Sequence, residues 1–142
     1  MAGEPFLMMN ADVFYDPSVI TALHAFECED AIVTELGRYI EESMKVVERD
    51  GRIVHIAKDV APEDALGTSI VVYRFSAEGG AAFFAACSDY IESKGQLKLW
   101  SEVALDDVLG KGEVLVRACP EDGRWLEIDN HDDLAMAEEL FA

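Results

Sequence analysis

The stretch from residue 44 to residue 58 constrains the fold more than any other part of the chain. Two runs in which apolar and polar residues alternate, 44–49 and 52–58, flank the pair Asp50 and Gly51. An Asp-Gly pair between two such runs is the strongest short-range signal for a β-hairpin, because both turn residues must adopt positive φ angles. The sequence therefore predicts an antiparallel hairpin at this place.

Segments typical of strands and helices alternate along most of the remaining chain. The predicted strands are residues 6–10, 31–36, 68–75, 113–119 and 125–129. Helices are predicted after Asp16, which we expect to cap the first of them, then after Ser76, over residues 101–109 and after Asn130. This alternation predicts an α/β fold in which helices flank a mixed, mostly parallel sheet. The length of 142 residues predicts a single domain over residues 1–142.

The charge of the chain excludes one class of partner. Asp and Glu number 29 against 11 Lys and Arg, which gives a net charge of −18. Such a surface repels a phosphate backbone, so DNA and RNA are not expected as partners. A small phosphorylated ligand remains compatible with this charge if a few basic side chains and a divalent cation gather in one cleft.

Nothing in the sequence indicates a membrane protein or a disulfide framework. No stretch approaches the roughly 20 apolar residues that cross a bilayer, and the first residues do not resemble a signal peptide. The 3 Cys residues lack the spacing of a zinc site, and their odd number is typical of a reducing compartment. We therefore expect a cytoplasmic protein.

Two aspartates occupy equivalent places at the ends of predicted strands. Asp12 follows the first strand, Asp129 closes the last one, and each precedes a predicted helix. Ligands of open α/β sheets bind at the carboxyl ends of the strands. Mg²⁺ takes one or two protein carboxylates together with water and substrate phosphates, so this pair is a candidate magnesium site. The alternative is that each Asp only shapes a turn, where Asp is common.

Five short segments carry a common resemblance. They are residues 7–13, 44–58, 67–76, 99–102 and 125–134, which read LMMNADV, MKVVERDGRIVHIAK, GTSIVVYRFS, LWSE and WLEIDNHDDL. In this order they resemble motifs of the nucleoside-triphosphate transferase family: a strand ending in Gly/Asn/Asp-x-Asp, a hairpin, the strand after it, a Tyr-Tyr-Glu-Asp segment and a closing Trp-x-Glu-Ile-Asp-x-x-x-Asp-Leu motif. The resemblance implies a nucleotide-diphospho-sugar transferase-like fold over nearly the whole chain.

Within this family the chain is most similar to the cytidylyltransferases that act on phosphocholine and on phosphonates. The latter include domains fused to phosphoenolpyruvate phosphomutase, such as those that act on 2-hydroxyethylphosphonate in fosfomycin biosynthesis. The resemblance implies an enzyme that transfers CMP from CTP to a small phosphonate or phosphate acceptor and releases pyrophosphate. It also implies a larger or fused protein, with phosphoenolpyruvate phosphomutase as the expected fused domain.

The resemblance also implies roles for particular residues. Asp12 and Asp129 match the positions that hold Mg²⁺ in the family, and Asn10, Ala11 and Asp12 match the segment that binds the nucleotide. Lys45 is the expected catalytic residue, because its charge would attract the anion of the acceptor that attacks. Its alternative reading is an ordinary solvated lysine on a strand.

Two glutamates are further candidates for binding the acceptor. Glu102 would accept a hydrogen bond from an acceptor hydroxyl or face an ammonium group, or it is a solvated residue at a helix start. Glu127 alternates with Asp129 along the predicted strand, so the two side chains point to the same side.

Two features depart from the family pattern. Val103 stands where the family often has Asp, and the Gly-x-Gly-x-Arg loop that cradles the triphosphate is not found. Backbone N–H groups and basic side chains of such a loop normally offset the triphosphate charge. Three explanations remain open: the loop lies on another polypeptide, the nucleotide binds differently, or the chain is a non-catalytic ligand-binding or interaction domain that retains the fold. A sheet edge exposed by the missing elements would need a partner, which includes a homo-oligomer.

Overall fold

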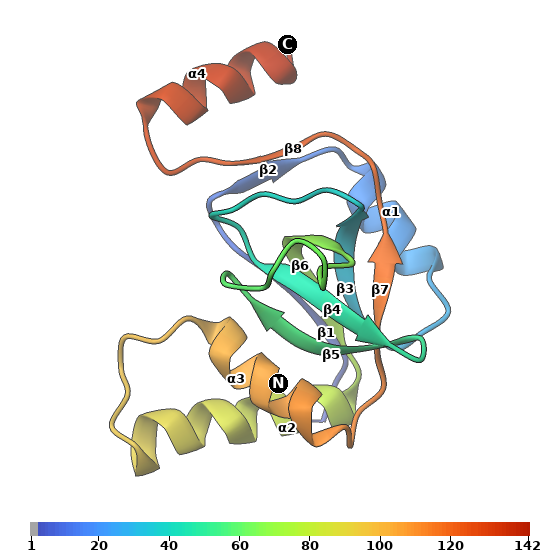
Figure 1. The fold of residues 1–142 in the computed structure, drawn as a ribbon, viewed down its shortest axis with the longest axis vertical. Helices are drawn as coiled ribbons and strands as arrows, with labels where there is room; N and C mark the ends of the chain where they lie inside the picture. Colours follow the sequence, from blue (N-terminus) through green and yellow to red (C-terminus); the bar gives the residue numbers. More distant parts are fainter. Residues whose placement is uncertain (1–2) are drawn as a thin grey trace.

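The computed structural model describes residues 3–142, so residues 1 and 2 of the predicted domain lie outside it, and it confirms the α/β class. The strands are β1 (Phe6–Met9), β2 (Val13–Tyr15), β3 (Asp30–Leu36), β4 (Lys45–Arg49), β5 (Arg52–Ala57), β6 (Gly67–Phe75), β7 (Val116–Pro120) and β8 (Trp125–Glu127). The helices are α1 (Ser18–Ala25), α2 (Ala77–Ser88), the π-helical turn η1 (Asp89–Ser93), α3 (Ser101–Lys111) and α4 (His131–Leu140). Helices α1, α2 and α3 pack around the sheet (Figure 1).

The described residues form one mixed six-stranded sheet and one two-stranded ribbon. The main sheet has the order β5-β4-β6-β3-β7, with β1 also paired to β6, and the ribbon consists of β2 and β8. The balance of strand directions differs from the expectation of a mostly parallel sheet. β3 and β7 run parallel, whereas the other pairs in this part of the chain are antiparallel. The order of strands along the chain does not reveal this, because it depends on which strands pair.

One edge of β6 is shared by two strands that approach it from opposite ends. β4 pairs with its first two residues, where Lys45 lies opposite Thr68, and β1 pairs with its last four, where Met9 lies opposite Val72. Between them Val71 has a φ of 55°, a conformation that a β-branched residue adopts only under strain of about 1–3 kcal/mol. The pairing of β6 with β3 shifts in register at the same level. The edge of β6 is therefore left without a paired strand around Val71.

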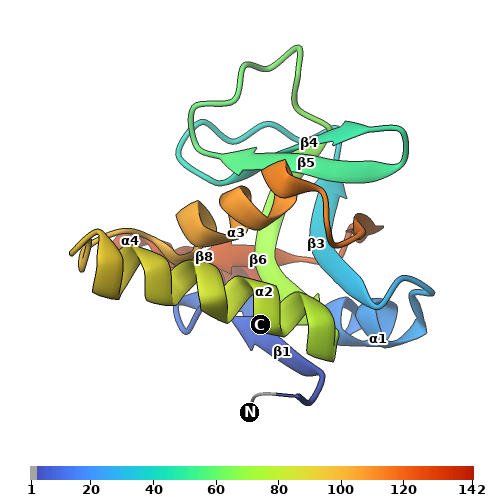
Figure 2. The same cartoon turned by 90° about the horizontal axis from the view of Figure 1, so that it is seen from below.

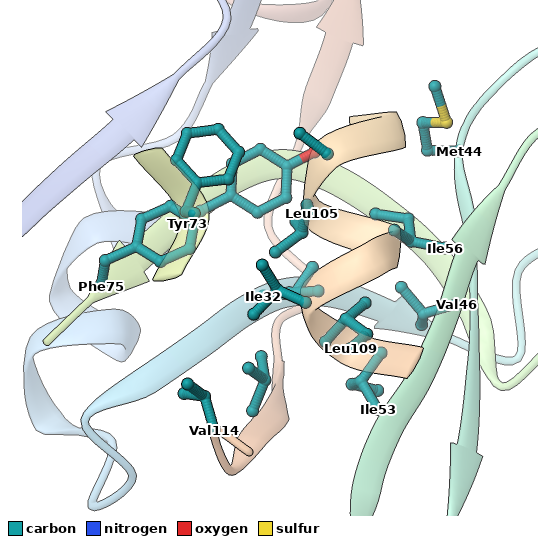
Figure 3. Packing of buried hydrophobic residues seen from close by; sticks show 14 of the residues in the cluster. Ile32, Met44, Val46, Ile53, Ile56, Tyr73, Phe75, Leu105, Leu109 and Val114 are labelled. Atoms are coloured by element: carbon teal, nitrogen blue, oxygen red, sulfur yellow. The ribbon is translucent and has the colours of Figure 1, made fainter. Parts of the chain in front are cut away.

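Two apolar clusters cover the two faces of the sheet. Alternate residues of β6 belong to different clusters: Val71 and Tyr73 join the one under α2 and α3, while Ile70 and Val72 join the one under α1. Figure 2 shows α3 and α2 stacked on one side of the strands, with the β4–β5 hairpin beyond α3. In Figure 3 the side chains of α3 reach between the strands of the hairpin and those of the central sheet.

The predicted hairpin is confirmed, including its turn. β4 and β5 pair antiparallel, and Asp50 and Gly51 have φ angles of 52° and 76°, the double positive pattern of a type I′ turn. A bulge between Val47 and Glu48 interrupts the strict alternation that the sequence predicts. The bulge changes which side chains of the hairpin share a face.

Gly51→Ala is expected to destabilise the protein by about 1–2 kcal/mol, because a Cβ makes the left-handed conformation costly. Gly110→Ala is the matched control, since Gly110 lies inside α3 and an added Cβ meets nothing within 4 Å. That change should stabilise by about 0.5–1 kcal/mol through helix propensity. Urea unfolding of the two variants measures both effects, and the same sign for both would contradict the turn assignment.

The start of α1 differs from the prediction that Asp16 caps it. Pro17 is the N-cap residue, and the helix has no side-chain cap. The carboxylate of Asp16 instead accepts hydrogen bonds from the backbone and the guanidinium of Arg124, with the closest ion-pair contact at 2.9 Å. This ion pair lowers the pKa of Asp16. A distant arginine thus replaces the local capping interaction and ties the end of β2 to the start of β8.

The last helix extends away from the body of the molecule (Figure 1). Asn130 caps it as predicted, because its side chain accepts hydrogen bonds from the backbone N–H groups of Asp132 and Asp133. Within residues 3–142, no helix combines the length and the apolar character needed to cross a bilayer.

Candidate functional site

A cavity of about 330 Å³ opens where β1 and β4 leave the edge of β6. Its lining residues are Asn10, Asp12, Glu42, Met44, Lys58, Val71, Trp100, Glu102, Glu127 and Asp129. The backbone N–H of Asn10 donates to the carbonyl of Val71 at 3.3 Å, and that of Ser69 donates to the carbonyl of Met44 at 2.8 Å. These two bonds hold both sides of the opening to the strained part of β6. Five of the predicted site residues therefore lie in one cavity: Asn10, Asp12, Glu102, Glu127 and Asp129.

The β2–β8 ribbon brings the two predicted metal ligands together. Val13 pairs with Glu127, and the backbone N–H of Ile128 donates to the carbonyl of Asp12 at 2.8 Å. This pairing places Asp12 and Asp129 on neighbouring chain segments at one end of the ribbon. Both side chains are exposed, and neither carboxylate accepts a hydrogen bond within the described residues. They are free to bind a cation.

The ribbon is anchored to the main sheet through side chains. The indole N–H of Trp125 donates to a carboxylate oxygen of Glu35 at 2.6 Å, and the hydroxyl of Ser43 donates to Glu127 at 3.1 Å. Arg38 pairs with Glu35 at 2.8 Å and lies over the indole ring. The carboxylate pair is thereby positioned by contacts with β3 and with the segment before β4.

Glu127 lies between opposing electrostatic influences. Burial raises its pKa above the ordinary value, and the negative charges of Asp129 and Asp12 raise it further. The hydroxyl of Ser43 and the charge of Lys58 act in the other direction. Because the charges of Asp129 and Asp12 contribute to the raised pKa of Glu127, a cation bound near these carboxylates would relieve repulsion.

Glu127→Gln is expected to change the pH dependence of stability. A carboxyl group whose pKa rises on folding holds its proton more tightly in the folded state. The folded protein then binds more protons than the unfolded chain between the two pKa values, and stability falls as pH rises through that window. The variant does not lose stability in this way. Its free energy of unfolding at pH 7 should therefore exceed that of the wild type, by less than about 1 kcal/mol after solvent screening.

Urea unfolding at about pH 4 and pH 7 measures this effect. At the lower pH, Glu127 is largely protonated in the folded protein and in the unfolded chain alike. Glu63→Gln, at an exposed position outside the cavity, is the control and should show no such difference between the two pH values. A wild-type advantage at pH 7 would contradict the raised pKa.

Glu102 is a buried carboxylate on the wall of the cavity. Its side chain is 4% exposed and accepts hydrogen bonds from the hydroxyls of Tyr73, at 2.9 Å, and Ser101, at 3.2 Å. Tyr73 is fully buried, and burial together with the charge of Glu102 raises the pKa of its hydroxyl. Two hydroxyl donors thus hold a carboxylate in place without neutralising its charge.

The structure distinguishes the two lysines of the hairpin. Lys58 lines the cavity, with its Nζ 4.5 Å from the centre of the Trp100 ring. Lys45 is fully buried, and its Nζ donates to the backbone carbonyls of Ile40, at 3.1 Å, and Glu41, at 2.6 Å. Burial lowers the pKa of Lys45. Its predicted catalytic role remains a prediction; here it fixes the segment that carries Glu42, and Lys58 supplies the positive charge of the cavity.

The carboxylates of the site suit a hard cation that keeps part of its own shell. In residues 3–142 no cluster of three or more His, Cys, Asp or Glu side chains is arranged to hold a metal ion. Two exposed aspartates match the way Mg²⁺ binds, with water and substrate phosphates filling the remaining positions. The donor set therefore fits Mg²⁺ held jointly by protein and substrate.

Some site residues escaped the sequence analysis. Glu42 lies outside the motif segments, whereas Met44 and Val71 lie within two of them but were not predicted as site residues. All three reach the cavity only because two strands share the edge of β6. Lys58 and Trp100 lie in the motif segments 44–58 and 99–102, but neither residue type marks a site by itself, because a lysine on a strand is commonly solvated and a tryptophan commonly belongs to the core. The predicted nucleotide-binding residue Ala11 is exposed between Asn10 and Asp12 and does not line the cavity.

Comparison with known proteins shows which solved structures share this fold. No protein-family model matches the chain, and no curated protein matches it by sequence. Similar solved structures include an inositol-1-phosphate CTP transferase from T. maritima (19% identity, TM-score 0.72) and a CTP:phosphocholine cytidylyltransferase from Streptococcus pneumoniae (15% identity, TM-score 0.68). A UDP-glucose pyrophosphorylase complexed with UDP-glucose is also similar (17% identity, TM-score 0.67).

These matches extend over nearly the whole chain. They cover 96%, 96% and 99% of it, and 54%, 57% and 57% of the respective structures. The chain therefore shares the fold of these proteins and spans about half of their length. The predicted nucleotide-diphospho-sugar transferase-like fold is confirmed.

Proposed function

We propose that this chain is a cytidylyltransferase domain that transfers CMP from CTP to a small phosphate or phosphonate acceptor and releases pyrophosphate. The observation that carries the proposal is the placement of Asp12 and Asp129 on paired segments at one cavity, with no competing partner among the described residues. The similarity to structures described as CTP transferases and nucleotide pyrophosphorylases supports it.

The proposed reaction is an in-line displacement. An oxygen of the acceptor phosphate or phosphonate forms a bond to the α-phosphorus of CTP, and the bond from that phosphorus to the pyrophosphate oxygen breaks. Mg²⁺, when bound, screens phosphate charge and stabilises the leaving oxygen. Asp12 and Asp129 would hold this cation, while Lys58 would attract the anionic groups of the acceptor.

The remaining wall of the cavity favours an acceptor with a cationic group. Besides the two aspartates, Glu42, Glu102 and Glu127 line the cavity, and only Lys58 opposes them there. An indole ring next to carboxylates is the chemistry that recognises quaternary ammonium groups. We therefore propose phosphocholine as the preferred acceptor and 2-hydroxyethylphosphonate as the alternative.

The test combines binding and turnover. The chain is incubated with CTP, Mg²⁺ and each acceptor, pyrophosphate release is followed, and ³¹P NMR identifies the CMP-linked product. We expect turnover with phosphocholine above that with 2-hydroxyethylphosphonate. Calorimetry with CTP and Mg²⁺ separates the alternatives. Binding without turnover identifies a non-catalytic ligand-binding domain, whereas the absence of binding of both CTP and Mg²⁺ refutes the proposal.

The proposals about the whole protein need their own measurements. A fused phosphoenolpyruvate phosphomutase domain and a homo-oligomer remain predictions from the sequence, as does the cytoplasm as its location. The mass of the native polypeptide and of its assembly in solution would test the first two.

A further inference from the structure

A second and larger cavity lies on the other side of the hairpin. It has a volume of about 800 Å³ and lies between the β4–β5 hairpin, the loop that follows β5 and the end of α3. None of its lining residues belongs to the cavity of Asp12 and Asp129. The proposed function gives this cavity no role.

Its most unusual feature is a pair of arginines that lie directly opposite each other. Arg49 and Arg52 are register partners across the hairpin, and both line the cavity. Like charges at such positions repel each other. Acidic residues outnumber basic ones 29 to 11, yet neither arginine forms an ion pair within residues 3–142. An anion between the two guanidinium groups would relieve their repulsion.

One of these guanidinium groups is held in place before any ligand arrives. Nη2 of Arg52 donates to the backbone carbonyls of Gly112, at 2.9 Å, and Val114, at 3.0 Å. These bonds fix the planar group without neutralising its charge. A pre-positioned guanidinium next to a second, exposed one matches the geometry with which arginine binds phosphate groups.

The other walls define the rest of the ligand. Asp59 and Asp64 line the loop side, and a carboxylate can accept hydrogen bonds from the hydroxyl groups of a ligand. Val47, Val54 and Leu109 provide apolar surface between the two charged walls. The volume far exceeds that of a phosphate ion alone, so the cavity has room for an organic group beside the phosphate.

We propose that this cavity binds a small hydroxylated phosphate monoester, with its phosphate between Arg49 and Arg52 and its hydroxyl groups toward Asp59 and Asp64. The site is independent of the proposed transferase reaction, so the failure of either proposal leaves the other standing.

The test is a ¹H–¹⁵N NMR titration of the whole chain at constant ionic strength. The probes are glycerol 3-phosphate, ethyl phosphate and inorganic phosphate. We expect shifts in residues 49–55, 59–64 and 109–112, with glycerol 3-phosphate binding several-fold more tightly than ethyl phosphate. Shifts confined to the residues around Asp12 and Asp129, or no shifts at millimolar probe, would overturn the proposal.

Three variants make the test specific. Arg49→Gln should weaken all three probes by about tenfold or more, because it removes charge-assisted hydrogen bonds. Arg117→Gln removes another exposed arginine, one outside the cavity, and should leave the affinity unchanged. If both variants weakened the affinity equally, the effect would come from the net charge of the protein, and the proposed site would be rejected.

Asp64→Asn tests the wall of the cavity opposite the arginines. Its result stays informative even if the Arg49 variant does not fold. It should bring glycerol 3-phosphate and ethyl phosphate closer in affinity while phosphate itself still binds. An unchanged ratio between the two esters would overturn the assignment of the hydroxyl groups.

Discussion

Asp12→Asn and Asp129→Asn should each reduce CMP transfer by about 10²–10³-fold, the size of effect seen when one group that stabilises developing charge is removed. An amide still accepts hydrogen bonds but carries no charge, so the affinity for the cation falls at the same time. Pyrophosphate release at increasing Mg²⁺ concentrations measures both effects. The stability of the variants should change little, because both side chains are exposed and unpaired within the described residues.

Two further measurements make this result specific. Mn²⁺, as a paramagnetic substitute, should broaden the NMR signals of residues 10–12 and 127–129 in the wild type and not in the variants. The pKa of Glu127 should fall in both variants, because each aspartate raises it. Asp122→Asn is the matched control, since this exposed residue lies outside the cavity. Unchanged transfer in the aspartate variants would disprove the metal assignment even if the domain is active.

The largest expected effect on stability comes from Leu105→Ala. Leu105 is fully buried on α3 and packs in the cluster with Ile53 and Ile56 of β5 (Figure 3). A cavity left by Leu→Ala in such a core costs about 2–5 kcal/mol. This is a large share of the roughly 5–15 kcal/mol that stabilises a typical domain. The midpoint of urea unfolding should fall accordingly.

Leu97→Ala is the control for this substitution. Leu97 is 77% exposed, so its truncation should change stability by less than about 0.5 kcal/mol. Because Glu102 lies in the first turn of α3, the loss of packing should also shift the NMR signals around the cavity of Asp12. A cost below that of the control would show that α3 does not depend on this contact.

The parts of the fold that could be predicted depend on local chemistry. The type I′ turn at Asp50 and Gly51 follows from the residues themselves, and so do the caps at Ser76 and Asn130. β2 escaped prediction because its three residues form a strand only through pairing with β8 at the other end of the chain. The Asp16 cap failed for the same reason, since Arg124 binds that carboxylate.

In the candidate site, too, the predictable features are local and the others depend on tertiary packing. Asp12 and Asp129 could be found because each was expected to follow a strand and to precede a helix, although Asp12 is in fact followed by β2. Their common cavity could not, because it depends on two strands sharing one edge of β6. Lys45 and Lys58 could not be ranked from alternation, because the bulge in the hairpin shifts its register. Burial decides between them, and burial is a property of the packed molecule.

The two aspartates lie at one end of a ribbon of only two short strands, and such a ribbon is marginally stable by itself. It is attached to the central sheet by the packing of Trp125, Val13 and Tyr15 on the apolar cluster under α1 and by a few polar contacts, chiefly those of Trp125 and Glu127. Partial unfolding of this unit therefore requires less free energy than unfolding of the whole molecule. Such an opening would separate Asp12 from Asp129 while the sheet stays intact. Amide protons of β2 and β8 should exchange with solvent before those of β3 and β6, and a bound cation should slow them selectively.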